Sequence, residues 1–257
     1  MIKIGSPLFI LREKCAVDLM SVIEKLAEIG YDGIEFLGFF GHKPVDIKKK
    51  LDSCGIKAIG NHVPFNEFSQ NVDRVINDHN EIGCKYITIS PPTVDGFPGG
   101  SDYAQTLEVF QMIGEAMKAA DMKLLFHNHA EELRSIVNGK AILEHIFDDT
   151  PLDILYCELD LGWISIGGGD PVYYLEKYGN RCPVVHFKDY IPAENDNGFL
   201  FRPTGYGVMN NAELFNMAKS YKPDWYIMDH DCAYERDIFY DLSISLNFFK
   251  DLIKVSE

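Results

Sequence analysis

The sequence contains no apolar run approaching the roughly 18 residues that a membrane-spanning helix needs. It also has no signal-peptide core before Arg12 and Glu13. These two absences argue against a membrane partner and predict a cytoplasmic protein.

Cysteine pairs and basic clusters are also missing. The six cysteines are scattered without a Cys-x-x-Cys pair, which disfavours a zinc ribbon or a disulfide framework and predicts reduced, mostly buried thiols. Lysine and arginine number 24 against 39 acidic residues, the net charge is −15, and the longest basic run is Lys48-Lys49-Lys50. Such a surface repels phosphate backbones, so we expect no nucleic-acid partner. There is no Gly-x-Ser-x-Gly elbow to suggest a nucleophilic triad.

Strand-like apolar segments alternate with helical patterns along the whole chain. The strand segments are residues 2–6, 33–37, 58–63, 86–90, 123–129, 155–160, 183–189 and 225–231, and helical patterns include 17–29, 66–82, 104–120, 171–177 and 237–255. Residues 191–210 are expected to be irregular. Strict alternation predicts an all-parallel sheet covered by helices, and eight units close an α/β (β/α)8 TIM barrel. We expect one domain over residues 1–257, with its active site at the C-terminal ends of the strands; a doubly wound open sheet is the alternative.

Glycines mark the turns between helices and strands. Gly30, Gly55 and Gly83 each follow a helical pattern and precede a strand, as left-handed helix caps do. The glycine run 167–169 lacks the residues of a phosphate-binding loop. A turn with Asp170 as helix N-cap and Pro171 at the first helical position is the better interpretation.

Polar residues end the last four strand segments. They are His127 and His129, Glu158 and Asp160, His186 and Lys188, and Asp229 and Asp231. Each pair is two residues apart, so both side chains of a pair point to one side of a strand. Burying charges without partners costs several kcal/mol, so mutual pairing or a bound cation is expected. A mixed His and carboxylate set suits Mn²⁺, Co²⁺, Zn²⁺ or Mg²⁺, whereas any one of these residues alone would be read as structural.

Three further residues are expected near the same end. Glu35 and His62 end the second and third strands, and each is either a substrate contact or a polar group facing water. Trp163 follows Asp160 and could present a flat apolar wall to a ring-shaped ligand or pack in the core.

Several motifs in this order resemble the xylose-isomerase-like (AP endonuclease 2) TIM-barrel superfamily, in its sugar phosphate isomerase/epimerase branch. They are His127-Asn128-His129 with Glu132, Asp160-Leu161-Gly162-Trp163, Gly168-Gly169-Asp170-Pro171, His186-Phe187-Lys188-Asp189 and Trp225-Tyr226-Ile227-Met228-Asp229-His230-Asp231. The resemblance spans essentially the whole chain.

The resemblance implies one divalent metal ion, with manganese as the natural choice and cobalt, zinc or magnesium as alternatives. Its expected ligands are His127, Asp160, His186 and Asp229; Asp160 and His186 match family ligands, whereas the other two stand where relatives have glutamate. Lys188 is expected to stabilise an enediolate oxygen, and Asp229 to move the proton. His129, Glu158, Asp231 and His62 are the other groups that could act as the base. The expected substrate contacts are Glu35, His62, Glu132, Trp163 and Asp231.

These residues lead us to expect a metal-dependent sugar isomerase or epimerase that acts through an enediolate on a keto or hydroxy sugar. A dehydratase or keto-glycoside lyase would use the same metal-stabilised enolate. A DNA endonuclease is disfavoured by the net charge of −15, and a non-catalytic sugar-binding barrel is the remaining alternative. The expected partner is a small sugar or sugar derivative, and homo-oligomers are common among such barrels.

Overall fold

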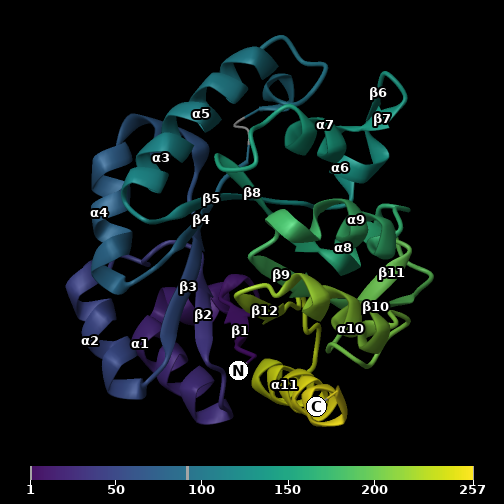
Figure 1. The fold of residues 1–257 in the computed structure, drawn as a ribbon. Helices are drawn as coiled ribbons and strands as arrows, with labels where there is room; N and C mark the ends of the chain where they lie inside the picture. The colour runs from purple at the N-terminus through teal and green to yellow at the C-terminus, as the bar shows by residue number, and fades with distance from the viewer. Residues whose placement is uncertain (1, 91–92, 257) are drawn as a thin grey trace.

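A closed barrel of eight parallel strands forms the centre of the molecule (Figure 1). The computed structural model describes residues 2–90 and 93–256, so residues 1 and 257, which bound the predicted domain, lie outside it. The strands are β1 (Ile4–Pro7), β2 (Gly33–Phe36), β3 (Lys57–His62), β4 (Tyr86–Thr88), β5 (Lys123–His127), β8 (Leu155–Asp160), β9 (Val184–Phe187) and β12 (Trp225–Met228). Because β1 pairs with both β2 and β12, the sheet has no edge. The predicted TIM barrel is confirmed, and the open sheet is excluded.

Helices surround the barrel (Figure 1). They are α1 (Arg12–Ile29), α2 (Pro44–Cys54), α3 (Phe65–Gln70), α4 (Val72–Ile82), α5 (Tyr103–Ala119), α6 (Glu131–Arg134), α7 (Ile142–Asp148), α8 (Leu161–Ile166), α9 (Pro171–Tyr178), α10 (Asn211–Tyr221) and α11 (Ile238–Ser256), with short 3-10 turns η1 (Phe9–Leu11), η2 (Val94–Gly96) and η3 (Gly179–Arg181). The single helix expected over residues 66–82 is broken at Asn71. The Asn71 side chain donates to the carbonyl of Glu67, and such local bonds compete with a continuous helix.

The predicted turns are confirmed. Gly30, Gly55 and Gly83 follow α1, α2 and α4 with φ of 102°, 69° and 76°, the left-handed conformation that glycine adopts without strain. The Asp170 carboxylate accepts a hydrogen bond from the backbone N–H of Val172, and Pro171 is the first residue of α9.

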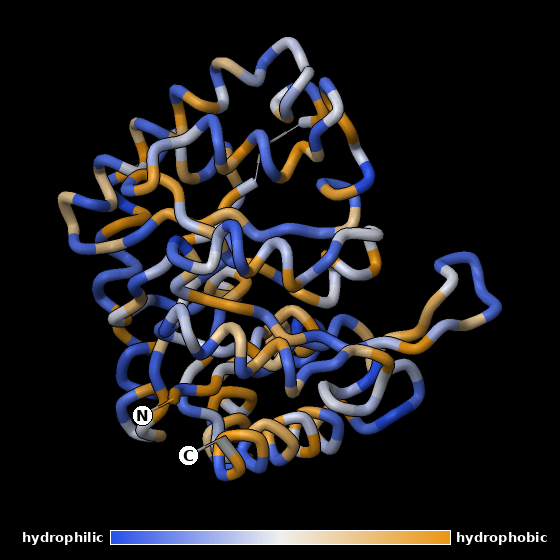
Figure 2. Tube along the Cα trace, turned by 45° about the vertical axis from the view of Figure 1, so that its right-hand side comes forward, coloured by the Kyte–Doolittle hydropathy of each residue, from blue (hydrophilic) through white to orange (hydrophobic). Residues whose placement is uncertain are grey.

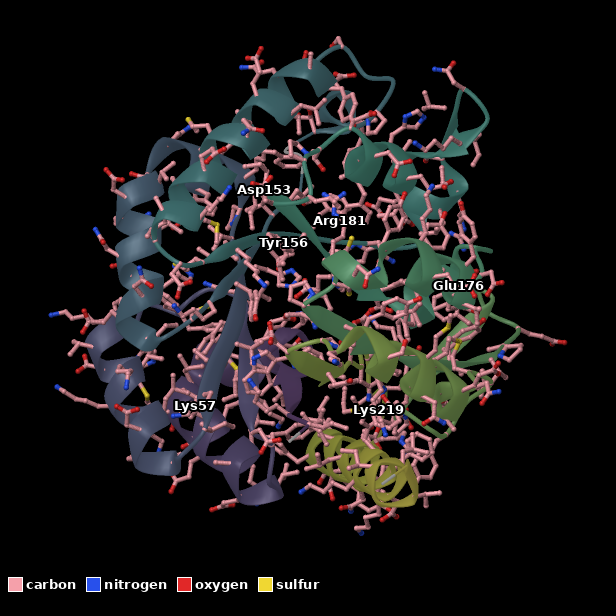
Figure 3. All side chains as sticks on the ribbon, viewed as in Figure 1. Lys57, Asp153, Tyr156, Glu176, Arg181 and Lys219 are labelled. Atoms are coloured by element: carbon pink, nitrogen blue, oxygen red, sulfur yellow. The ribbon has the colours of Figure 1, made fainter. Side chains whose placement is uncertain are left out.

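The two ends of the barrel interior differ in polarity. A small apolar cluster, formed by Ile59, Tyr86, Leu125, Val184, Trp225 and Ile227, fills the part nearer the strand starts. Gly33 leaves room for it, because a Cβ there would lie 2.6 Å from Ile59 and 2.7 Å from the Trp225 ring. Outside the barrel, the buried Arg181, beside β8 in Figure 3, donates to the carbonyl of Leu155 at 3.1 Å and attaches η3 to the start of β8. The polar residues gather at the C-terminal ends of the strands, at the opposite end of the barrel from this apolar cluster.

Strand register aligns these polar residues. His127 of β5 pairs with Glu158 of β8, and Asp160 of β8 pairs with His186 of β9. All three strands therefore deliver their last inward-facing side chains at one level.

An irregularity in β3 decides where His62 points. Ile34 of β2 pairs with Ala58, but Phe36, two residues later, pairs with Asn61, so β3 carries one extra residue. Asn61 consequently points outward and contacts His79 of α4 at 2.7 Å, whereas His62 points into the barrel. A bulge of this kind re-aims a side chain, as is common next to functional sites.

Two antiparallel hairpins interrupt the alternation. β10 (Asp189–Pro192) and β11 (Phe199–Arg202) form one within the stretch expected to be irregular, and β6 (Ile136–Val137) and β7 (Lys140–Ala141) form the other. The β10–β11 hairpin projects from the barrel and has a hydrophilic tip (Figure 2).

The prediction of free, mostly buried thiols is confirmed. All six cysteines are free thiols, and Cys15, Cys84, Cys157 and Cys182 are buried. Within residues 2–90 and 93–256, no helix combines the length and apolar character that crossing a bilayer requires.

Candidate metal and substrate site

Four predicted ligands meet at the C-terminal end of the barrel. His127 ends β5, Asp160 ends β8, His186 lies in β9 and Asp229 directly follows β12. Each can offer one nitrogen or oxygen, and these four atoms lie within 4.8 Å of one another. All four side chains are buried. A set of two imidazoles and two carboxylates is a donor set that Mn²⁺, Co²⁺ and Zn²⁺ accept, so these residues fit a divalent metal ion.

The four proposed ligands form two close pairs. His186 Nδ1 lies 3.1 Å from Asp229 Oδ2, and His127 Nε2 lies 3.9 Å from Asp160 Oδ2. Burial raises the pKa of Asp160 to about 7, and the neighbouring charge of Asp229 adds to the effect. Burial also opposes ionisation of Asp229, but Lys188 and His186 hold the pKa of Asp229 well below its usual value. A cation between the two carboxylates would favour the charged form of both.

Lys188 lies beside the same carboxylates. Its Nζ atom is 3.1 Å from Asp160 Oδ2, 3.0 Å from Asp229 Oδ2 and 2.7 Å from Asp231 Oδ2. Burial opposes the ammonium charge, but these three carboxylates raise the pKa of Lys188 above its usual value. The ammonium also lies over the faces of Trp163 and Phe201, at 4.9 Å and 5.3 Å from the ring centroids. Lys188 is therefore charged and held in one position.

A second cluster of polar side chains, His62, Glu35 and Glu158, lies next to the proposed ligands. His62 Nε2 is 3.4 Å from Glu35 Oε2 and 3.2 Å from Glu158 Oε2. Burial alone would lower the pKa of His62, but the charges of these two glutamates raise it to about 10. Thr88 Oγ1 donates to Glu158 Oε2 at 3.0 Å. No sequence pattern singled out Thr88, because its residue type and position are ordinary for a strand.

His129 lies beyond the end of β5 yet still reaches the site. Its ring centroid is 5.0 Å from that of His127 and 5.6 Å from that of Trp163. Glu132 holds this turn, because its Oε2 accepts a hydrogen bond from the His129 backbone N–H at 2.8 Å. His129 is exposed to solvent, yet the partial loss of hydration that the surrounding protein imposes on its ring, together with the charge of Lys188, lowers the pKa of His129. His129 is therefore neutral near neutral pH.

A pocket of about 180 Å³ opens over these groups. Most of the predicted site residues line it: Glu35, His62, His127, His129, Trp163, His186, Lys188, Asp229 and Asp231. Asp160, Glu158 and Glu132 lie outside the lining. Sequence reasoning missed the apolar part of the wall, which consists of Pro7, Leu8, Phe9, Phe36 and Leu37. Apolar residues at the ends of strands look like core residues in a sequence, so no signal distinguished them.

Negative charge exceeds positive charge at the site. The carboxylates of Glu35, Glu158, Asp160, Asp229 and Asp231 are within ion-pairing distance of its histidines or Lys188. Protonated His62, protonated His186 and Lys188 offset three of the five charges. Buried charges need compensation, so a divalent cation fits the electrostatics as well as the donor set.

The fold and this cluster define the class: a (β/α)8 barrel with a candidate metal centre at the C-terminal ends of its strands. Residues 23–242 match the family model described as xylose isomerase-like TIM barrel. The chain belongs to this family.

Similar curated proteins are named inosose dehydratase. One from Geobacillus kaustophilus is 24% identical over 193 residues, which are 65% of this chain and 61% of that protein. The match thus spans less than two thirds of the relative. One from Bacillus cereus is 21% identical over 241 residues, or 80% of each chain.

Solved structures share the fold. A sugar phosphate isomerase/epimerase from Parabacteroides distasonis has a TM-score of 0.79 and 23% identity, over 96% of this chain and 93% of its own. The probable 3-DHS dehydratase AsbF of Bacillus anthracis, involved in petrobactin synthesis, has a TM-score of 0.75 and 15% identity, over 97% and 99%. At these identities the likeness concerns the fold.

Proposed function

We propose that this chain is a divalent-metal-dependent sugar isomerase or epimerase that acts through an enediolate on a keto or hydroxy sugar. The observation that supports this most strongly is the convergence of His127, Asp160, His186 and Asp229 within 4.8 Å beside a buried lysine. A metal ion held there, manganese in our proposal, would supply Lewis acidity toward a sugar carbonyl.

The chain's own residues would handle charge and protons. Lys188 keeps its ammonium charge in the pocket, where it can stabilise an oxygen that becomes negative as the adjacent C–H is deprotonated. His129 is neutral and lines the pocket, so it can accept that proton. Asp229 is the weaker base, because its charge is paired with Lys188 and His186.

The remaining lining residues would bind the substrate. Glu35, His62 and Asp231 offer hydrogen-bonding groups for hydroxyls, and Trp163 offers an aromatic wall for a sugar ring. Glu132 would act indirectly, through the backbone of His129.

A dehydratase or keto-glycoside lyase is the second candidate. Two observations favour it: the curated relatives are named inosose dehydratase, and His129 is the one neutral imidazole at the pocket that is not a proposed ligand. Epimerisation needs proton transfer on both faces of the substrate, whereas elimination can start from one base.

Deuterium exchange tests both candidates. The protein loaded with Mn²⁺ is incubated in D₂O with ketoses and keto-glycosides, and the products are followed by NMR. Deuterium next to the carbonyl of a recovered isomer supports the isomerase or epimerase, and loss of water or aglycone selects the second candidate. Retention of every C–H across the panel, with metal bound, contradicts enolisation and leaves a sugar-binding barrel.

Two variants sharpen the result. His129→Gln removes the proposed base and should slow exchange by about 10²–10⁴-fold. Asp251→Asn, an exposed change on α11, should leave exchange at the wild-type rate. Equal rates in all three proteins would remove His129 from the proton-transfer step.

A further inference from the structure

Glu158 contacts two of the proposed metal ligands at once. Its Oε2 lies 3.4 Å from His127 Nδ1, and its Oε1 lies 3.5 Å from His186 Nε2. The side chain is fully buried and does not line the pocket. Glu158 therefore lies behind the pocket wall, whereas its predicted role in moving a proton would require contact with the substrate.

Each of the two ligand histidines has one ring nitrogen directed at Glu158. His127 presents Nδ1 to Glu158 and its other nitrogen, Nε2, to Asp160. His186 presents Nε2 to Glu158 and Glu35, and its Nδ1 to Asp229. Both nitrogens of each ring therefore face buried carboxylates. With a cation bound between Asp160 and Asp229, one nitrogen of each ring would face the cation and the other would still face Glu158.

This arrangement selects one tautomer for each ring. A neutral imidazole carries one N–H and one lone pair, and only the lone pair can bind a cation. A carboxylate accepts hydrogen bonds, so it keeps the N–H on the nitrogen that faces it. The buried His127 Nδ1 and Glu158 Oε1 atoms make no hydrogen bond in this structure, so the Glu158 contacts at 3.4 Å and 3.5 Å are ion-pair contacts that a bound cation would complete by leaving the N–H on this side of each ring.

We infer that Glu158, assisted by Glu35, is a positioning residue that fixes the orientation and tautomer of both ligand histidines. This inference rests on the metal site of the proposed function. Strand β8 then serves the site twice: Asp160 binds the ion, and Glu158, two residues earlier on the same inward face, orients the neighbouring ligands. Thr88 and His62 hold the Glu158 carboxylate in place.

The test is metal affinity, measured by competition with a chelator dye. Glu158→Gln keeps the size of the side chain but removes the charge, and its amide N–H₂ would face one of the two imidazoles. We expect Mn²⁺ and Zn²⁺ affinity to fall by about 10–100-fold, as for other residues that orient ligand histidines. Thr88→Val leaves the carboxylate but removes its hydrogen bond, and should weaken binding by a smaller factor.

The matched control is Glu132→Gln. Glu132 is also a buried glutamate near the site, but it contacts the backbone of His129 and neither ligand histidine. Its metal affinity should equal that of the wild type.

The visible spectrum of bound Co²⁺ adds a readout that lost stability alone would not change. At saturating Co²⁺, Glu158→Gln should show shifted bands, because the histidines bind in altered orientations, and Glu132→Gln should keep the wild-type spectrum. Circular dichroism checks folding; if Glu158→Gln does not fold, Thr88→Val decides the question.

The outcomes separate the two hypotheses. A wild-type protein that binds no divalent ion overturns the proposed function itself. A wild-type protein that binds the ion, with folded Glu158→Gln and Thr88→Val variants of unchanged affinity and Co²⁺ spectrum, overturns the positioning role of Glu158 alone.

Discussion

Lys188 shows how a single residue can depend on its neighbours for its charge. An isolated ammonium in a protein interior loses its hydration and tends to become neutral. Here three carboxylates lie within 3.1 Å of Nζ, and two aromatic rings cover it. The dependence is mutual, because Asp160 and Asp229 are buried as well and need a positive neighbour.

Removing this ammonium should therefore destabilise the fold. We expect Lys188→Met to lower the free energy of unfolding by about 3–5 kcal/mol in metal-free protein, because it leaves buried carboxylates unpaired. Urea denaturation in EDTA measures the loss. Lys25→Met, which breaks an exposed ion pair with Glu28, should cost less than about 1 kcal/mol. Equal losses for the two variants would show that the carboxylates do not rely on Lys188.

Residue types and spacing predicted much of the site, but not how deep each group lies. Pairs such as His186 and Lys188, two residues apart at the end of a strand, indicate one inward face and one end of the barrel. Glu158 and Asp160 carry the same signal, yet Asp160 belongs to the four-residue group of candidate ligands, whereas Glu158 contacts both histidines and belongs only to two smaller groups of three. The difference arises from the register of β8 against β5 and β9, which spacing within one strand does not contain.

At the scale of elements, the sequence predicted the regular alternation of strands and helices, but not the bulge and the hairpin that interrupt it. Eight strands and the five predicted helical patterns, which correspond to α1, α3 with α4, α5, α9 and α11, follow from apolar periodicity. The bulge in β3 leaves no mark in the sequence, although it turns His62 inward and Asn61 outward. The β10–β11 hairpin was likewise missed, because polar residues 193–198 separate its short strands; it supplies Phe201, which packs over Lys188.

Close packing between β2 and its neighbours gives a prediction for these elements. Gly33→Ala would place a Cβ 2.6 Å from Ile59 and 2.7 Å from Trp225, so the inner cluster must shift. Overpacking of this kind costs about 1–3 kcal/mol, which thermal unfolding can measure. Gly60→Ala in β3 meets its nearest atoms at 3.4 Å and should cost less. If the Gly33→Ala protein were as stable as the Gly60→Ala protein, the inner cluster would be able to move away from the added Cβ at no cost in stability.

At the scale of the whole molecule, the topology of the barrel determines where the charged residues of the site lie. Parallel strands in a closed barrel end on the same side, so four strand ends distant in sequence bring their polar residues to one pocket. The chain is acidic overall, with a net charge of −15. Three carboxylates line this pocket, and those of Glu158 and Asp160 are buried next to it. A bound cation would therefore relieve repulsion in the folded state, and its effect should extend to global stability.

Metal binding should raise the melting temperature of the whole barrel. An ion that binds only the folded chain, at 100 times its dissociation constant, adds about 2.7 kcal/mol, which corresponds to roughly 5–11 °C for a domain of this size. Scanning fluorimetry with Mn²⁺ and with EDTA measures the shift. Asp229→Asn removes a proposed ligand and should lose most of it, whereas Asp251→Asn, on the exposed face of α11, should keep the full shift. The same shift in both variants would place the stabilising ion away from the barrel mouth, and its absence from the wild type would argue against a metal site altogether.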